Sequence, residues 1–338
     1  MKRNGVVYRF RAMAFALSLG LVLFGLSPFV HAQQTGKIFR IGYLDPSDAL
    51  GSAVFMDVFR QELGRLGWNE GKNFTIDYRF LEQKLERAPE LMGELLGLKV
   101  DLIVVTGTVP ASAAKHATSI VPIVMANVGD PVGAGLVASL ARPGGNVTGL
   151  SGLSPELNTK RLEILKDALP KLARVGLLTL TGASIATDLQ LKELRDAALA
   201  LKLKLEEIDT QADPKGLDSA FQTAKQKQAS AIMTTASPRF FTERKRIVEL
   251  AGKYRLPAMY FQKEFVDEGG LMSYGVDYDE LYRQAAHYVD KILKGAKPAD
   301  LPVEQPIKFE FIINLKAAKQ IGLTIPPNVL ARADKVIK

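Results

Sequence analysis

The chain of 338 residues contains no cysteine. It can therefore form no disulfide bond, and it offers no thiol for nucleophilic catalysis, metal binding or lipid attachment, so we expect no lipoprotein form. Stability has to come from a buried apolar core, and a hydrophobic content of 47% is enough to build one.

Histidine is almost as scarce, with only His31, His116 and His287. No His-Glu-x-x-His sequence indicates a zinc hydrolase, and no Gly-x-Ser-x-Gly sequence indicates a serine hydrolase. The stretch from Gly129 to Gly135 lacks both the spacing of a dinucleotide fingerprint and the Lys-Ser/Thr of a nucleotide loop, so we interpret it as a turn. We therefore predict no catalytic residue, no metal site and no cofactor.

A strong excess of charge and a long apolar run are also missing once residues 1–32 are set aside. These residues begin with four basic side chains, continue with an apolar run from Met13 to Leu26 and end in Val30-His-Ala32. This pattern predicts a secretory signal peptide cleaved after about Ala32, with an uncleaved membrane anchor as the alternative. Its removal lowers the net charge from +8 to +4, which is too little to indicate a nucleic-acid partner. The signal peptide predicts export to the periplasm, and since later segments contain no run of 18 apolar residues, we expect the mature protein to be soluble there.

What is present behind this leader is a steady alternation of strand and helix patterns. Strands are expected at Ile38–Leu44, Asn73–Phe80, Leu102–Val105, a run starting at Val121, Val147–Leu153, Val175–Leu180, Lys204–Ile208, Ala231–Thr235, Pro257–Phe261, Leu271–Tyr274 and Lys308–Ile313, with helices between most of them. The pattern starts afresh at Arg174, which favours two successive βαβαβ blocks over the alternative of one (β/α)₈ barrel.

We therefore predict an α/β protein with two Rossmann-like lobes that have parallel sheets. The first lobe is expected to comprise residues 33–150 plus about 262–304, and the second residues 151–261 plus about 305–338. If the C-terminal part completes both lobes, the chain crosses between them more than once, and the crossing segments form a hinge.

Small polar residues follow many of the expected strands, and open α/β sheets bind ligands at the carboxyl ends of their strands. Thr106-Gly-Thr108 precedes a helix opened by Pro110, so its backbone N–H groups could receive a carboxylate or phosphate. For each candidate, a role as a turn former or helix cap is an equally good interpretation. The candidate ligand-binding residues are Asp45, Ser47, Thr106, Gly107, Thr108, Asp130, Ser151, Thr181, Ser184, Ser237, Tyr260, Tyr274 and Asp277.

These side chains are hydroxyls, aromatic rings and a few carboxylates, without a nucleophile paired to a base. Such a set suits binding better than bond breaking. It also suits an amino acid with an aromatic or branched side chain, because amides and hydroxyls can hold the carboxylate, an Asp can hold the ammonium, and a Tyr or Phe ring can pack on the side chain.

Four long motifs resemble one known family in the same order along the chain. They are Val128–Leu150 (VGDPVGAGLVASLARPGGNVTGL), Gly269–Gly275 (GGLMSYG), Tyr288–Pro302 (YVDKILKGAKPADLP) and Ile313–Ala318 (INLKAA). The chain is similar through them to the tryptophan/tyrosine-type ABC-transporter substrate-binding proteins. The resemblance covers essentially the whole chain after the leader.

The resemblance implies a type I periplasmic-binding fold, with two lobes, three hinge crossings and a small-molecule ligand held between the lobes. It also implies delivery to an ABC permease in the inner membrane and, as we expect, a monomer. The first-lobe pocket would use the loops at Asp45–Ser47 and Thr106–Thr108 together with Asp130. The second lobe would contribute the loops after Leu180 and Thr235, with Asp277 near the hinge.

This chain departs from many relatives on the second-lobe side. It has Thr179-Leu-Thr-Gly-Ala-Ser184 where they carry an Asn-Pro element, and Ala236-Ser-Pro238 where they often have an Asp-Pro turn. The alternatives to a transport role are a sensory module that presents ligand to a membrane receptor and, less favoured, a secreted α/β enzyme.

Overall fold

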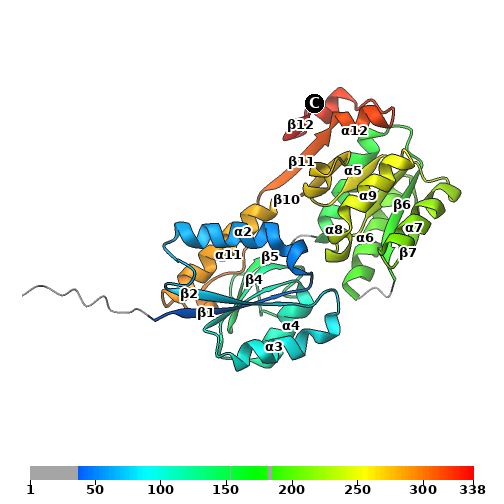
Figure 1. The fold of residues 1–338 in the computed structure, drawn as a ribbon. Coiled ribbons are helices and arrows are strands. Elements are labelled where there is room, and N and C mark those ends of the chain that lie inside the picture. Colours follow the sequence, from blue (N-terminus) through cyan, green and yellow to red (C-terminus); the bar gives the residue numbers. More distant parts are fainter. Residues whose placement is uncertain (1–36, 153, 182–184) are drawn as a thin grey trace, which may run out of the picture. The chain divides into compact units, whose positions relative to one another are not determined.

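The computed structural model describes residues 37–152, 154–181 and 185–338, and it contains two separate sheets (Figure 1). The first sheet has five parallel strands in the order β2-β1-β3-β4-β5. These strands are β1 (Phe39–Asp45), β2 (Phe74–Phe80), β3 (Leu102–Thr106), β4 (Ile123–Val128) and β5 (Val147–Ser151). The central strand β3 is buried along its whole length, whereas β2 is half-exposed, as its alternating sequence predicts for an edge.

The second sheet has seven strands in the order β12-β11-β10-β9-β8-β6-β7. They are β6 (Arg174–Leu180), β7 (Lys204–Thr210), β8 (Ala231–Thr234), β9 (Ala258–Tyr260), β10 (Met272–Val276), β11 (Phe309–Asn314) and β12 (Lys335–Ile337). All neighbouring pairs are parallel except β10 and β11, which run antiparallel. Two separate sheets are incompatible with a single closed barrel, and they confirm the prediction of two α/β lobes.

Helices cover both faces of each sheet. The longer ones are α2 (Ala49–Arg65), α3 (Ala88–Gly97), α4 (Thr108–Ala117), α5 (Ser154–Ala168), α6 (Ile185–Ala200), α7 (Pro214–Gln226), α9 (Arg244–Lys253) and α11 (Tyr278–Leu293). Helices α2 and α11 pack on one face of the first sheet and α3 and α4 on the other. In the second lobe, α7 and α9 lie on one face, and α5 and α6 on the other.

The chain passes between the lobes three times. It leaves the first sheet after β5, returns after β10 into α11, and leaves again ahead of β11. Strand β10 belongs to the second sheet, so the return follows Val276, later than the boundary expected near residue 262. Residues 262–276 look like the start of a new unit in the sequence, but β9 and β11 each form hydrogen bonds with β10.

Several short elements lie outside the expected pattern. The sequence from Ser237-Pro238 to Tyr254 predicts one helix, whereas the structure has two, α8 (Pro238–Thr242) and α9, with Glu243 between them. The short helices α10 (Glu264–Asp267) and α13 (Pro327–Leu330) and the strand β12 give too few periodic positions to be read from sequence, whereas α12 (Leu315–Gln320) lies where a helix is expected.

A close backbone approach joins β4 to β5 at Gly149. This residue has φ +124°, and a Cβ atom there would lie 2.3 Å from the Met125 carbonyl oxygen. Only glycine fits both the dihedral angle and the space. The register between the two strands shifts after Met125, which indicates an irregularity in the ladder.

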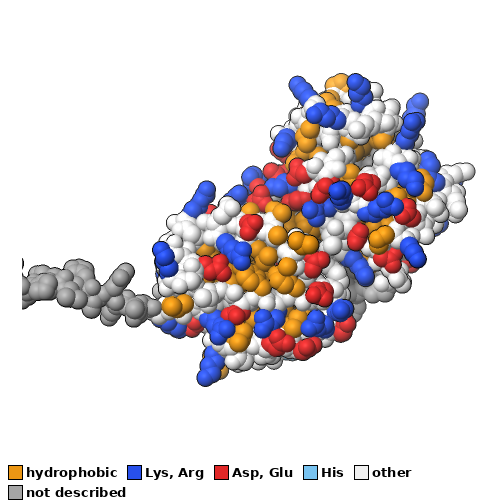
Figure 2. All heavy atoms as spheres, viewed as in Figure 1, with side chains coloured by type: hydrophobic (Ala, Val, Ile, Leu, Met, Phe, Trp, Pro, Cys, Tyr) orange, Lys and Arg blue, Asp and Glu red, His pale blue; other side chains and the backbone are white. Residues whose placement is uncertain are grey.

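The surface shows no field of one sign on the face drawn in Figure 2, where basic and acidic side chains alternate over both lobes. Within the described ranges, no helix is long and apolar enough to cross a membrane.

Candidate ligand-binding site

The carboxyl end of β1 carries a buried hydrogen-bond network. The Asp45 carboxylate accepts the Ser47 backbone N–H at 2.8 Å, the Ser47 hydroxyl, and the Thr106 hydroxyl at 2.9 Å. The Ser47 and Ser52 hydroxyls lie 2.7 Å apart. The structure thus brings Asp45, Ser47 and Thr106 together, as expected, and it fixes them mainly through bonds to one another.

Gly107 and Thr108 form the start of α4. Gly107 is the N-cap with φ +77°, a conformation that favours glycine, and its N–H donates to the Asn127 carbonyl at 2.7 Å. Thr108 is half-buried and is the first residue of the helix, so this end of the sheet presents a helix N-terminus as the sequence indicates.

Asp130 and Ser151 make local contacts. Asp130 is exposed, and its carboxylate accepts the N–H groups of Val132 and Gly133 at 3.1 and 2.8 Å. The Ser151 hydroxyl donates to the Gly129 carbonyl at 3.4 Å. These bonds stabilise the turn after β4, which is the turn-former interpretation of both residues.

The candidates of the second lobe are spread over different surroundings. The Thr181 side chain is exposed, and the Ser237 hydroxyl caps α8 by accepting the Phe240 N–H at 3.1 Å. Tyr260 is a core residue whose ring stacks on Phe265 with centroids 4.7 Å apart, and burial raises the pKa of its hydroxyl. Ser184 lies outside the described residues.

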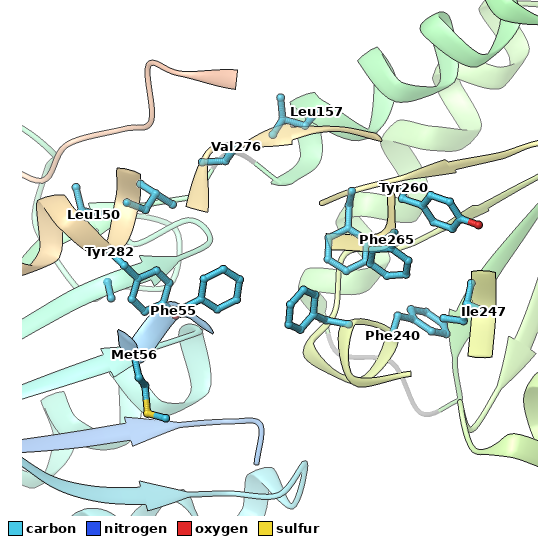
Figure 3. Packing of buried hydrophobic residues seen from close by; sticks show 14 of the residues in the cluster. Phe55, Met56, Leu150, Leu157, Phe240, Ile247, Tyr260, Phe265, Val276 and Tyr282 are labelled. Carbon is cyan, nitrogen blue, oxygen red and sulfur yellow. The ribbon is translucent and has the colours of Figure 1, made fainter. Parts of the chain in front are cut away.

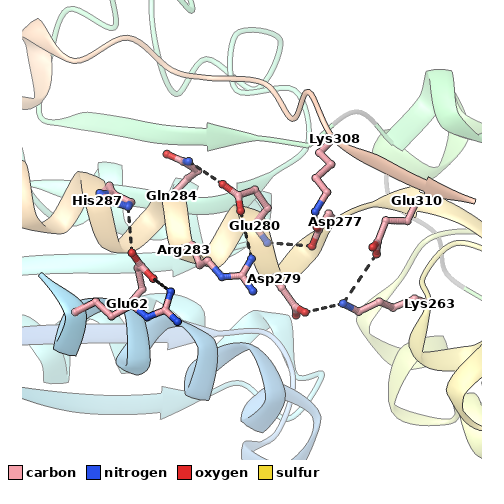
Figure 4. Close-up of polar contacts among 11 residues, drawn as sticks. Glu62, Lys263, Asp277, Asp279, Glu280, Arg283, Gln284, His287, Lys308 and Glu310 are labelled. Atoms are coloured by element: carbon pink, nitrogen blue, oxygen red, sulfur yellow. Dashed lines mark hydrogen bonds and ion pairs between the residues drawn. The ribbon is translucent and has the colours of Figure 1, made fainter. Parts of the chain in front are cut away.

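Tyr274 and Asp277 lie at the second crossing. The Tyr274 ring stacks on Phe309 with centroids 6.2 Å apart. The Asp277 carboxylate caps α11 by accepting the Glu280 N–H at 3.1 Å, and it also pairs with the Lys308 ammonium at 2.5 Å (Figure 4). Burial opposes its ionisation, but these two bonds outweigh burial and lower the pKa of Asp277.

A group of aromatic rings joins the two lobes and was not anticipated from sequence. The ring of Phe55 on α2 lies 5.5 Å from that of Phe241 on α8, 5.6 Å from Tyr278 and 5.0 Å from Tyr282, centroid to centroid. Figure 3 shows Phe55 and Tyr282 on one side and Phe240 and Phe265 on the other. At helical spacing such residues predict ordinary core, so only their meeting in space identifies them.

Arg161 on α5 was also missed, although its helix gives a signal. It follows Leu157 by four residues and precedes Leu165 by four, so a charge stands on the apolar face. Its side chain is 3% exposed and donates to the Tyr274 carbonyl at 2.6 Å, the Asn158 side-chain oxygen at 2.7 Å and the Phe261 carbonyl at 3.4 Å. Burial lowers the pKa of Arg161 to about 10, so the guanidinium stays charged at neutral pH.

Arg161 lies close to the aromatic group. Burial raises the pKa of Tyr278, against the attraction of the Arg161 charge and a hydrogen bond with Asn127. A cation on the second lobe and an amide on the first therefore both act on the Tyr278 hydroxyl of α11.

An ion pair forms a further contact between the lobes. The Lys263 ammonium lies 2.6 Å from the Asp279 carboxylate on α11 and 4.0 Å from that of Glu310 (Figure 4). Both side chains of the 2.6 Å pair are about three-quarters buried, so solvent screens the pair only partly.

The groups gathered here are suited to binding a ligand. Rings, a buried guanidinium, amides and hydroxyls surround the crossing segments, and the described part of the chain has no group of three or more potential metal ligands.

The same conclusion comes from comparison with known proteins. The sequence model of the family described as ABC transporter substrate binding protein matches residues 51–337. The chain belongs to this family. It is therefore a substrate-binding protein of the ABC-transporter type and not an enzyme.

Individual relatives agree with this assignment. The substrate-binding protein is 28% identical over 268 residues to a tyrosine-binding protein of Clostridioides difficile (strain R20291), covering 78% of this chain and 75% of the relative. It resembles a conserved domain protein of Vibrio cholerae with a TM-score of 0.80 and 30% identity, over 89% of this chain and 100% of the other. It resembles an ABC domain from Streptococcus pneumoniae in complex with L-Trp with a TM-score of 0.78 and 27% identity, over the same shares.

Proposed function

We propose that this substrate-binding protein is the periplasmic component of an ABC importer for an aromatic amino acid. It binds the ligand between the lobes, closes on it by a hinge motion, and releases it unchanged to a permease in the inner membrane. The observation that carries the proposal is the meeting of aromatic rings from both lobes beside a buried guanidinium.

Arg161 suits the carboxylate of such a ligand. Guanidinium has five N–H donors, and the contacts to Tyr274, Asn158 and Phe261 use three of them. The other two donate to no group within the described ranges and could form charge-assisted hydrogen bonds, which are about twice as strong as neutral ones.

The rings suit the side chain. Aromatic pairs gain roughly 0.5–1.5 kcal/mol beyond area burial, and the rings of Phe55 and Phe241 approach from different lobes. A ligand ring packed against rings of both lobes would favour the closed arrangement over the open one, because it contacts both lobes only when they are together. Two of the relatives are a tyrosine-binding protein and a domain in complex with L-Trp, which agrees with this.

The polar ends of the first-lobe strands complete the proposed site. Thr106, Gly107 and Thr108 contribute a hydroxyl-lined helix start, and Ser237 contributes the corresponding start in the second lobe. Asp130, Ser151 and Tyr260 support the loops and the core around it. A leader over residues 1–32 would bring the protein to the periplasm; those residues lie outside the described part of the chain, so cleavage stays a prediction.

A ligand screen tests the proposal. Protein freed of carried-over ligand by unfolding and refolding is checked by native mass spectrometry, then melted with each aromatic amino acid, other amino acids and neutral sugars. An aromatic amino acid at 100 times its dissociation constant should stabilise the fold by about 2.7 kcal/mol, and sugars should give no shift. Stabilisation by sugars alone, or turnover of any compound, would refute the proposed function.

A further inference from the structure

Glu264 is the least satisfied buried charge among the residues described. It is the first residue of α10 in the second lobe, and it is only 7% exposed. Both of its carboxylate oxygens are buried and have no hydrogen-bond partner within the described ranges. A buried carboxylate without a partner is costly, and folded proteins rarely keep one that serves no purpose.

The described neighbours of Glu264 form no hydrogen bond with its carboxylate oxygens. Lys263 is adjacent in sequence, but its ammonium is engaged by Asp279 at 2.6 Å and faces Glu310 at 4.0 Å. Asp267 on its own helix and Asp279 on α11 carry the same sign of charge and disfavour its ionisation. Lys263 attracts the Glu264 carboxylate, but among the described residues no cation is hydrogen-bonded to it.

The residues on either side of Glu264 place it near the proposed site. The Lys263 ammonium lies 2.6 Å from the Asp279 carboxylate on α11, and the Phe265 ring lies 6.5 Å from the Phe241 ring, centroid to centroid. The pKa of Tyr278 agrees with this placement, because the Arg161 charge lowers it and the Glu264 charge raises it. Counting the described residues alone, this region has a buried carboxylate with no hydrogen-bond partner and a guanidinium with two N–H groups that donate to none. An α-amino acid carries the complementary pair of charges, an ammonium and a carboxylate, on one carbon atom.

We propose that Glu264 contacts the ligand and accepts its ammonium group. This inference rests on the proposed function, because it takes the ligand to lie against the same rings. It narrows the class of preferred ligands to compounds with a free cationic amine, over deaminated acids and neutral sugars. The nearby rings of Phe55 and Tyr278 add to the attraction, since ring faces favour a cation.

Titration calorimetry of the whole protein without its leader tests the inference. The probes are L-tyrosine, L-tryptophan and L-phenylalanine, the corresponding deaminated propanoic acids, the corresponding amines without a carboxylate, and a neutral sugar. In the wild type, each amino acid that binds should bind at least about 100-fold more tightly than its deaminated acid.

The decisive variant is Glu264→Gln, which keeps the shape and removes the charge. It should weaken binding of the amino acid about 100-fold and leave binding of the deaminated acid unchanged. The matched control is Glu268→Gln, an exposed position four residues on, which should bind like the wild type. Circular dichroism and melting of both variants show whether they are folded.

The outcomes separate this inference from the proposed function. If aromatic amino acids bind and Glu264→Gln binds them equally well, the function stands and the role of Glu264 is refuted. If another amine binds in place of aromatic amino acids and is lost in Glu264→Gln, the ligand assignment fails and Glu264 keeps its role. If no cationic probe binds, or only neutral or anionic probes do, the inference is overturned.

Discussion

At the scale of single residues, the carboxyl group of Glu264 couples stability to pH. Burial raises the pKa of Glu264 to about 7, against the attraction of its own backbone N–H and of Lys263, while Asp279 and Asp267 raise it further. Tyr278 on α11 also faces this group. A carboxyl whose pKa is higher in the folded chain takes up a proton on folding. Its contribution therefore favours folding below the unfolded-state pKa of 4.5 and is lost as the pH rises towards 7.

We expect Glu264→Gln to stabilise the ligand-free protein at pH 8 and to have little effect near pH 4. The gain at pH 8 has a ceiling of about 3 kcal/mol, because each unit of pKa shift corresponds to about 1.4 kcal/mol. Urea unfolding of wild type and variant at both pH values measures it. Glu268→Gln, at an exposed position that pairs with Arg244, should change stability by only a few tenths of a kcal/mol at either pH. Equal effects of Glu264→Gln at both pH values would contradict this account.

At the scale of elements, the junction of β4 and β5 depends on the absence of a side chain. A Cβ atom on Gly149 would lie 2.3 and 2.6 Å from the Met125 carbonyl oxygen and nitrogen, at a φ of +124°. Since β5 leads directly into the first crossing, this junction positions the segment that enters α5.

We expect Gly149→Ala to lower the free energy of unfolding by roughly 2–4 kcal/mol, from backbone strain and from the clash. Gly64→Ala is the matched control. Gly64 is exposed in the last turn of α2, and a Cβ there meets no atom within 4 Å, so alanine should leave stability unchanged or raise it by less than about 1 kcal/mol. Chemical denaturation of the wild type and the two variants measures the free energy of unfolding of each. An unchanged value in Gly149→Ala would show that β4 and β5 can move apart without cost.

At the scale of the whole molecule, ligand affinity depends on contacts that exist only when the lobes are together. The pair between Lys263 and Asp279 is such a contact, because Lys263 precedes α10 in the second lobe and Asp279 lies on α11 against the first sheet. A ligand shifts the equilibrium between the open and closed conformations only by the difference in its affinity for the two. A contact between the lobes stabilises the closed conformation and therefore contributes to the same equilibrium.

We expect Lys263→Ala, Asp279→Ala and the double variant to weaken ligand binding by a similar factor of about 2–5, since all three lose the same pair. Titration calorimetry at low and high salt measures the coupling, which should shrink as salt screens the charges. The control is the pair of Arg283 with Glu280, at 3.2 Å within α11. A double-mutant cycle on Arg283 and Glu280 should leave ligand affinity unchanged. If the losses of affinity in Lys263→Ala and Asp279→Ala add strictly in the double variant, the two residues do not act as a pair.

Much of the fold was open to prediction because it depends on local periodicity. Buried apolar runs such as Leu102–Val105, and caps such as Ser237 and Asp277, are set by neighbours in sequence, and the structure has them where the pattern predicts. The elements that sequence reasoning missed, α10 and β12 among them, are too short to show a period.

The candidate site, too, was only partly open to prediction from the sequence. The sequence alone determined the alternation of strands and helices, the two lobes, the family and the polar strand ends at Asp45 and Thr106, because these follow from spacing and composition. Only the tertiary structure decided that β10 belongs to the second sheet, that Phe55 meets Phe241, and that Arg161 and Glu264 are buried near Tyr278. The reason is physical: the pairing of distant strands and the desolvation of a charge depend on atoms far away along the chain, which no local pattern specifies.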